Sequence, residues 1–119
     1  MDNVKFNYLY RDGANYKSWG EVAFANPNQL TLEEIETRLI ESFLPDKLFI
    51  ASQISIPEKF LFVDGKFTKF DHCYHKFDSV EICEENPTDD LDRSITDFLK
   101  VVEQASRQGW EVFDVLDRA

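Results

Sequence analysis

The strongest constraint on the fold is a strict two-residue repeat near the start of the chain. An apolar series alternates with a more polar one, and the two series are Val4, Phe6, Tyr8, Tyr10 and Lys5, Asn7, Leu9, Arg11. Such a repeat is typical of a β-strand, because successive side chains of a strand point to opposite faces. The pattern therefore predicts a strand at about residues 4–11.

A second strand follows after a turn. Asp12-Gly13 is a turn signal, and the segment from Trp19 to Phe24 again favours a strand, at about residues 16–25. The two strands are close enough in sequence to form an antiparallel hairpin with a longer loop. Asn26-Pro27-Asn28 ends the second strand, because proline cannot donate a ladder hydrogen bond.

Two amphipathic helices are predicted. Thr31 and Glu34 form a capping-box pattern at the start of a helix at about residues 32–43, and Pro45 stops it. The second helix, at about residues 90–107, has an apolar stripe, and Gly109 fits its end. Three acids are expected in its first turn, where the helix dipole favours them, and these are Asp89, Asp90 and Asp92.

The middle of the chain predicts further strands. One is expected at 48–56, before a break at Pro57, and another at 60–63 leads through the hairpin signal Asp64-Gly65 into a returning strand at 66–70. A strand at 74–83 is expected to carry a bulge near Asp78-Ser79. Residues 110–115 predict a short last strand or a tail packed on the sheet.

These elements indicate the fold class. Strands joined by hairpins, with helices between the groups, favour an α+β domain over residues 1–119, with a mainly antiparallel sheet and both amphipathic helices on one face. A chain of 119 residues has the size of one domain. There is no apolar run of about 18 residues and no secretory signal, and the two cysteines form no disulfide framework, so a cytoplasmic protein with no membrane contact is expected.

The charge balance narrows the choice of partners. The net charge is -10, which argues against binding nucleic acid. Eight acids lie between Asp78 and Asp97 and only Arg93 opposes them, so we expect one strongly negative face. Four of these acids are candidates for binding a partner protein, namely Glu84, Glu85, Asp89 and Asp90. The alternative is a solvated helix start; no EF-hand pattern supports a calcium site.

The segment Asp71–Asp78 gathers both histidines and one cysteine. On a strand, Asp71, Cys73 and His75 lie on one face, and Cys83 completes four zinc ligands if it lies across a strand pair from Cys73. The alternative is a pair of surface histidines beside a buried cysteine, since the spacing fits no established zinc pattern. The chain contains no catalytic or cofactor motif, so no cofactor is expected.

The first hairpin is the other unusual region. Arg11 and Lys17 are rare cations in an acidic chain and lie near Trp19. They are candidates for recognising a carboxylate or a partner, and the alternative is that they balance local acids.

The same segments carry a resemblance. Tyr8-Leu9-Tyr10-Arg11-Asp12 with Asn15-Tyr16-Lys17, followed later by Asp71-His72, His75 and the run 77–81, resembles a family of small uncharacterised bacterial proteins. The resemblance spans most of the chain and implies a bacterial, cytosolic setting. That family has no assigned function, so the resemblance implies no activity.

Two functions from different classes remain. The first is a non-enzymatic module that binds a protein partner, for example an immunity-like or antitoxin-like protein, with oligomerisation left open. The alternative is a small enzyme or a metal-binding protein that uses the Asp71–Asp78 cluster.

Overall fold

The aromatic strand near the N-terminus lies inside a four-stranded antiparallel sheet. The computed structural model describes residues 2–12, 16–60 and 72–115. Its strands are β1 (Asn3–Arg11), β2 (Lys17–Phe24), β3 (Leu48–Phe49) and β4 (His75–Cys83), and they lie in the order β2-β1-β4-β3. The predicted hairpin is confirmed: β1 and β2 pair antiparallel, with Val4 opposite Phe24 and Arg11 opposite Lys17.

Strand β4 pairs with the other side of β1 and carries the predicted bulge. Asn7 pairs with Ser79, whereas the next residue, Tyr8, pairs with Phe77. Asp78 is therefore the extra residue on β4, which makes this a β-bulge.

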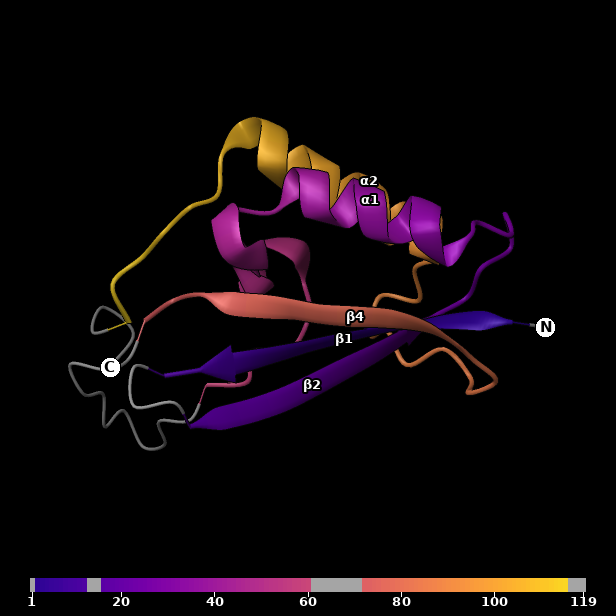
Figure 1. Cartoon of the computed structure of the whole chain (residues 1–119), viewed down its shortest axis with the longest axis horizontal. Helices are drawn as coiled ribbons and strands as arrows, with labels where there is room; N and C mark the ends of the chain where they lie inside the picture. The colour runs from indigo at the N-terminus through magenta and orange to yellow at the C-terminus, as the bar shows by residue number, and fades with distance from the viewer. Residues whose placement is uncertain (1, 13–15, 61–71, 116–119) are drawn as a thin grey trace.

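Both helices cover one face of the sheet, as predicted (Figure 1). Helix α1 (Leu32–Ser42) is capped at its N-terminus by Thr31, whose side chain accepts a hydrogen bond from the backbone N–H of Glu34. Helix α2 (Ile95–Gln108) lies beside α1, and Gly109 ends it with a positive φ of 94°. The salt bridge between Arg38 and Glu103 joins the two helices, with Nη2 and Oε1 2.7 Å apart.

The core lies between the helices and the sheet and is rich in aromatic rings. The Phe6 ring lies 5.4 Å from that of Phe77 on β4 and 5.2 Å from that of Phe98 on α2. Ile35 and Leu39 of α1 are fully buried against the same cluster. The period-two and helical stripes of the sequence therefore meet in one core.

The start of α2 differs from the prediction. The helix begins at Ile95 rather than near residue 90, and its capping box consists of Ser94 and Asp97. Asp89, Asp90 and Asp92 therefore precede the helix instead of filling its first turn. Asp89 binds Arg93, and Asp92 has a left-handed backbone with φ of 54°, so the chain turns here before the helix begins.

The predicted strand at 48–56 is wrong for most of its length. Only Leu48–Phe49 is a strand, and it lies between the 3-10 helices η1 (Pro45–Lys47) and η2 (Ala51–Ile54). Ala51 and Ile54 are buried and three residues apart, which matches the period of a 3-10 helix. Ser55 ends the turn in the left-handed conformation, with φ of 58°.

Two further predictions concern the middle of the chain and its C-terminal tail. The strands expected at 60–63 and 66–70, with the hairpin between them, lie outside the described residues except for Phe60, which is in no strand. Residues 110–114 form no strand and instead pack as a tail, where the Trp110 indole donates a hydrogen bond to the Ser42 carbonyl at 2.9 Å. No helix in the described ranges has the length and apolar character needed to cross a membrane.

Candidate functional site

The face of the sheet opposite the helices carries the alternate side chains of each strand. On β1 these are Lys5, Asn7, Leu9 and Arg11, because their neighbours Phe6, Tyr8 and Tyr10 are buried on the helix side. On β2 the same face presents Lys17, Trp19 and Glu21. Trp19 is 56% exposed, so more than half of its surface is open to solvent.

One end of this face is acidic, and the cation of β1 at this end, Lys5, is paired. The Lys5 ammonium lies 2.6 Å from a carboxylate oxygen of Glu85, 3.5 Å from one of Glu21 and 3.8 Å from one of Glu81. The hydrogen bond to Glu85 is the main reason why the pKa of Lys5 is raised. This end therefore has a net negative charge.

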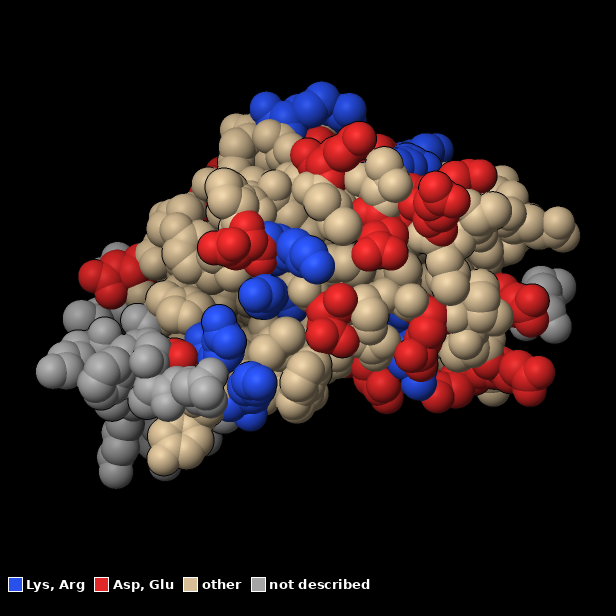
Figure 2. Space-filling model, in the orientation of Figure 1, with Lys and Arg blue, Asp and Glu red and all other residues tan. Residues whose placement is uncertain are grey.

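The other end of the face is basic. Arg11 and Lys17 lie directly opposite each other on β1 and β2, and Lys76 of β4 pairs with Leu9. Figure 2 shows a group of Lys and Arg side chains in the left half of the view and mainly Asp and Glu side chains in the right half. Within the described ranges these three cations form no salt bridge, whereas Lys5, Arg38 and Arg93 all do.

A cleft lies at the basic end, where β1, β4 and β3 meet. It has a volume of about 400 Å³ and is lined by Arg11, Asp46, Leu48, His72, Tyr74 and Lys76. The register explains this grouping, because Lys76 lies between Leu9 and Leu48 and Arg11 follows Leu9 by two residues on the same face. We call this hollow the basic cleft.

His72 is held rigidly at the edge of the basic cleft. Its Nδ1 accepts a hydrogen bond from the Tyr74 backbone N–H at 3.0 Å, and its Nε2 lies 2.7 Å from the Arg11 carbonyl. An accepting Nδ1 leaves the proton on Nε2, which donates to that carbonyl. Both ring nitrogens are therefore engaged, and the ring positions Arg11 and Tyr74 rather than serving as a free base.

His75 lies on the opposite face, in the core. It is 1% exposed, and its Nε2 accepts a hydrogen bond from the Lys59 backbone N–H at 2.8 Å. Its ring lies among those of Tyr8, Tyr10, Phe49 and Phe60. Burial, together with the nearby His72, lowers the pKa of His75 to about 4, so the ring is neutral at pH 7.

The structure does not bring the proposed metal ligands together. Cys83 does not lie across a strand pair from Cys73: it lies at the far end of β4, where it pairs with Asn3, and Cys73 precedes the start of the same strand. Cys73 is buried in a small second core with Ile50 and Val115. Asp71 lies outside the described residues, and among the others no three His, Cys, Asp or Glu side chains are grouped so as to hold a metal ion.

The four acidic candidates differ in their surroundings. Asp89 is buried in its salt bridge with Arg93, and Glu85 binds Lys5. Glu84 and Asp90 are exposed. By contrast, Arg11, Lys17 and Trp19 do lie together on the helix-free face.

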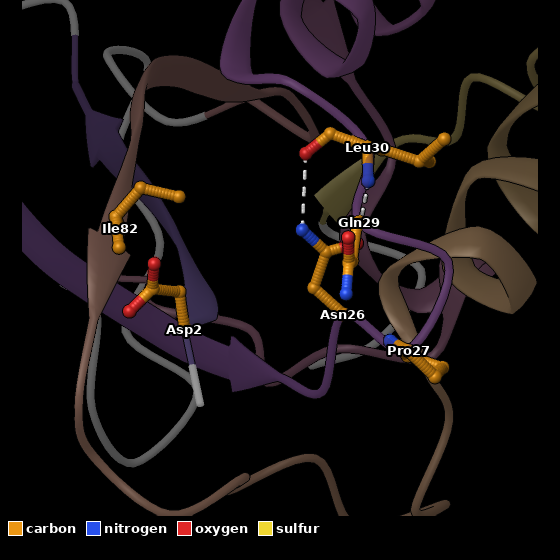
Figure 3. Close-up of a pocket in the computed structure, with 6 residues that line it drawn as sticks. All are labelled: Asp2, Asn26, Pro27, Gln29, Leu30 and Ile82. Carbon is orange, nitrogen blue, oxygen red and sulfur yellow. Dashed lines mark hydrogen bonds between the residues drawn. The ribbon is translucent and has the colours of Figure 1, made fainter.

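A second hollow lies at the other end of the sheet. Figure 3 shows Asp2 and Ile82 on one side of it and the segment from Asn26 to Leu30 on the other, around a volume of about 610 Å³. The Asn26 side chain already binds both the N–H and the carbonyl of Leu30, each at 3.0 Å. Among the described residues that line it, Asp2 alone is charged, so they offer little to orient a ligand.

Sequence reasoning found Arg11 as a binding candidate but missed Lys76, Tyr74, Leu48 and Asp46. Tyr74 and Lys76 lie in the segment that was singled out, but as neighbours of the histidines rather than as candidates. No sequence pattern marked Asp46 and Leu48 as site residues, because their place in the cleft depends on η1 and the short β3. No family model, curated protein or solved structure matches this chain.

Proposed function

We propose that the protein is a non-enzymatic interaction module that binds an acidic group of a partner protein in the basic cleft. The observation that supports this is the pair Arg11 and Lys76, which line one cleft together with Asp46 but form no salt bridge within the described residues of a chain of net charge -10. By contrast, Lys5, Arg38 and Arg93 form salt bridges inside the fold.

The arrangement suits a carboxylate. A guanidinium presents a planar fork of donors that matches a carboxylate, and the ammonium of Lys76 adds a second positive charge. Leu48 and the ring of Tyr74 offer apolar surface beside these groups. Like charges opposite each other on neighbouring strands are unfavourable, so Arg11 and Lys17 gain from a bound anion.

Composition alone suggested a basic partner for this acidic chain, whereas the proposal names an acidic one. A basic target would need an open acidic patch at 78–97, and three carboxylates of this range already have partners: Asp89 binds Arg93, Glu85 binds Lys5, and Asp97 accepts a hydrogen bond from the Ser94 N–H. The proposal also includes a bacterial cytoplasmic setting, which is supported by the sequence resemblance and by the free thiols of Cys73 and Cys83.

The test compares two charge-matched double variants. Arg11→Gln with Lys76→Gln removes both cations of the cleft, and Arg107→Gln with Lys100→Gln removes two exposed cations of α2 that form no salt bridge in the described structure. Each protein is immobilised, and proteins retained from a lysate of the source organism are identified. We expect a partner that is retained by the wild type and by the α2 variant and is lost with the cleft variant.

Binding of that partner is then measured against salt. Because the contact is electrostatic, its on-rate should fall as salt rises, and the cleft variant should remove this dependence. Equal retention by both variants, or the lack of any retained partner, would contradict the proposal.

A further inference from the structure

Strand β2 forms an edge of the sheet, and its outer backbone groups can be assigned from the hydrogen bonds at its end. The Ala23 N–H donates to the Thr88 hydroxyl at 2.8 Å, and the Ala23 carbonyl accepts from the Thr88 N–H at 2.9 Å. The Ala25 carbonyl accepts from the Ile95 N–H at 2.8 Å. Ala23 and Ala25 therefore point away from β1.

The backbone groups of every second residue of β2 point in this same outward direction. N–H and C=O groups of alternate residues point to the same side, so the backbones of Lys17, Trp19 and Glu21 also point outward. The loop around Thr88 covers the end of the strand near Ala23, and within the described structure no group pairs with these three outward backbones. Figure 1 shows β2 along the outer edge of the sheet.

The side chains of this open edge carry opposite charges at equal distances along the strand from Trp19. Lys17 and Glu21 lie two residues before and two residues after it, and all three are exposed on the helix-free face. If a second copy of the strand pairs antiparallel with Trp19 opposite Trp19, then Lys17 faces Glu21 of the second copy and Glu21 faces its Lys17. The edge is thus complementary to itself, as a two-fold symmetric interface requires.

We infer that the protein forms a symmetric homodimer through the β2 edge, with Trp19 on the two-fold axis. Each of the three facing pairs is a hydrogen-bonded pair that exchanges two N–H···O bonds, and the two sheets become one. The indoles form a cross-strand aromatic pair, and the two Lys17–Glu21 pairs flank it. This inference does not depend on the partner proposed for the basic cleft.

The charges select one register. A shift by two residues in one direction places Lys17 opposite Trp19 of the second copy and loses both ion pairs. A shift in the other direction needs the backbone of Ala23, which Thr88 already occupies. Charged residues often keep edge strands apart, but here opposite signs at matched positions attract.

The interface is short, so the dimer is weak and forms as concentration rises. Sedimentation across a dilution series should show a monomer–dimer equilibrium for the wild type. Hydrogen exchange should show the amides of Lys17, Trp19 and Glu21 slowing as concentration rises, while those of exposed loop residues stay unchanged. A wild type that remains monomeric at every concentration overturns the inference.

Charge reversal tests the register. Lys17→Glu and Glu21→Lys each place like charges at both symmetric pairs, so each should weaken dimerisation by about tenfold. Mixing the two single variants restores both ion pairs and should give a heterodimer, and the double variant Lys17→Glu with Glu21→Lys should dimerise again.

The folded state of each variant is checked by thermal melting, because Glu21 also contacts Lys5. Lys17→Glu does not remove a contact with Lys5, so this variant alone is enough to test the register. Reversal of Lys100, an exposed cation on α2, is the matched control and should leave the equilibrium unchanged. A dimer that Lys17→Glu does not weaken uses another surface, and that result also overturns the inference.

Discussion

Arg93 holds the carboxylate of Asp89 through two parallel hydrogen bonds, from Nε to Oδ2 and from Nη2 to Oδ1, both 2.9 Å long. The same guanidinium donates to the carbonyls of Ile54 and Ser55 and lies 5.2 Å from the centre of the Phe98 ring. Burial by itself raises the pKa of Asp89, but the hydrogen bonds and charge of Arg93 outweigh burial and lower it. The pair thus fastens the segment before α2 to η2 and the core.

Breaking this pair should destabilise the protein strongly. Asp89→Asn leaves Arg93 buried without its counter-charge, which is expected to cost about 3–5 kcal/mol of unfolding free energy. The neighbouring exposed Asp90→Asn is the control and should change stability by less than about 0.5 kcal/mol. Urea denaturation of both variants measures the difference, and equal midpoints would show that the pair does not stabilise the fold.

Two neighbouring residues of α1 should respond differently to truncation. Leu39 is fully buried, whereas Ile40 is 41% exposed. Leu39→Ala is expected to cost about 2–5 kcal/mol because it removes buried methyl groups and leaves a cavity. Ile40→Ala removes the same kind of side chain from the surface and should cost much less. A similar loss in both variants would contradict the packing of α1 on the sheet.

Gly20 is required by the ring of Tyr8 on the adjacent strand. A Cβ atom at Gly20 would lie 2.6 Å from Cζ of Tyr8, whose hydroxyl donates to the Pro57 carbonyl at 2.6 Å. Gly20→Ala should therefore displace a fully buried ring and cost about 1–3 kcal/mol.

A double-mutant cycle separates this clash from the backbone effect of glycine. In a Tyr8→Ala background the added methyl group meets no ring, so the cost of Gly20→Ala should disappear. Denaturant curves of the four proteins provide the measurement. An undiminished cost in that background would mean that the strand itself, and not Tyr8, requires glycine.

The elements with strong local signals were predictable from the sequence. The alternation of β1, the Thr31 cap of α1 and the extra residue at Asp78 all depend on neighbouring residues, and the structure has them where expected. The start of α2 was not predictable, because Asp89 binds Arg93 instead of the helix end, and Arg93 in turn donates a hydrogen bond to the Ile54 carbonyl. Helix propensity depends on the local sequence and takes no account of such tertiary contacts.

The candidate site was predictable only in part. Arg11, Lys17 and Trp19 form one hairpin, so their proximity follows from the strand register. Lys76 joins them because β4, which comes much later in the sequence, pairs with β1, and no local sequence pattern specifies that pairing. The histidines were candidates for a metal or catalytic site because of their chemistry, yet His72 is fixed by two hydrogen bonds and His75 is buried.

The buried His75 should make stability depend on pH. Its pKa is lowered to about 4 in the folded protein, whereas the unfolded chain binds the proton near the usual value of 6.5. The unfolded state therefore gains a proton first as the pH falls, so stability is full above about pH 6.5 and is lost between pH 6.5 and 4, by about 3 kcal/mol in total. Below pH 4 both states are protonated and this contribution levels off.

His75→Leu tests this dependence. The variant loses the acceptor for the Lys59 N–H and is less stable throughout, so the informative quantity is the change of unfolding free energy with pH and not its absolute value. Urea denaturation at closely spaced pH values from 4 to 7 should show a steep loss in the wild type and a much shallower one in the variant, since the carboxylates that titrate lower are common to both. Parallel curves would mean that His75 is protonated as easily in the folded protein as in the unfolded chain, and that its core environment does not exclude the charge.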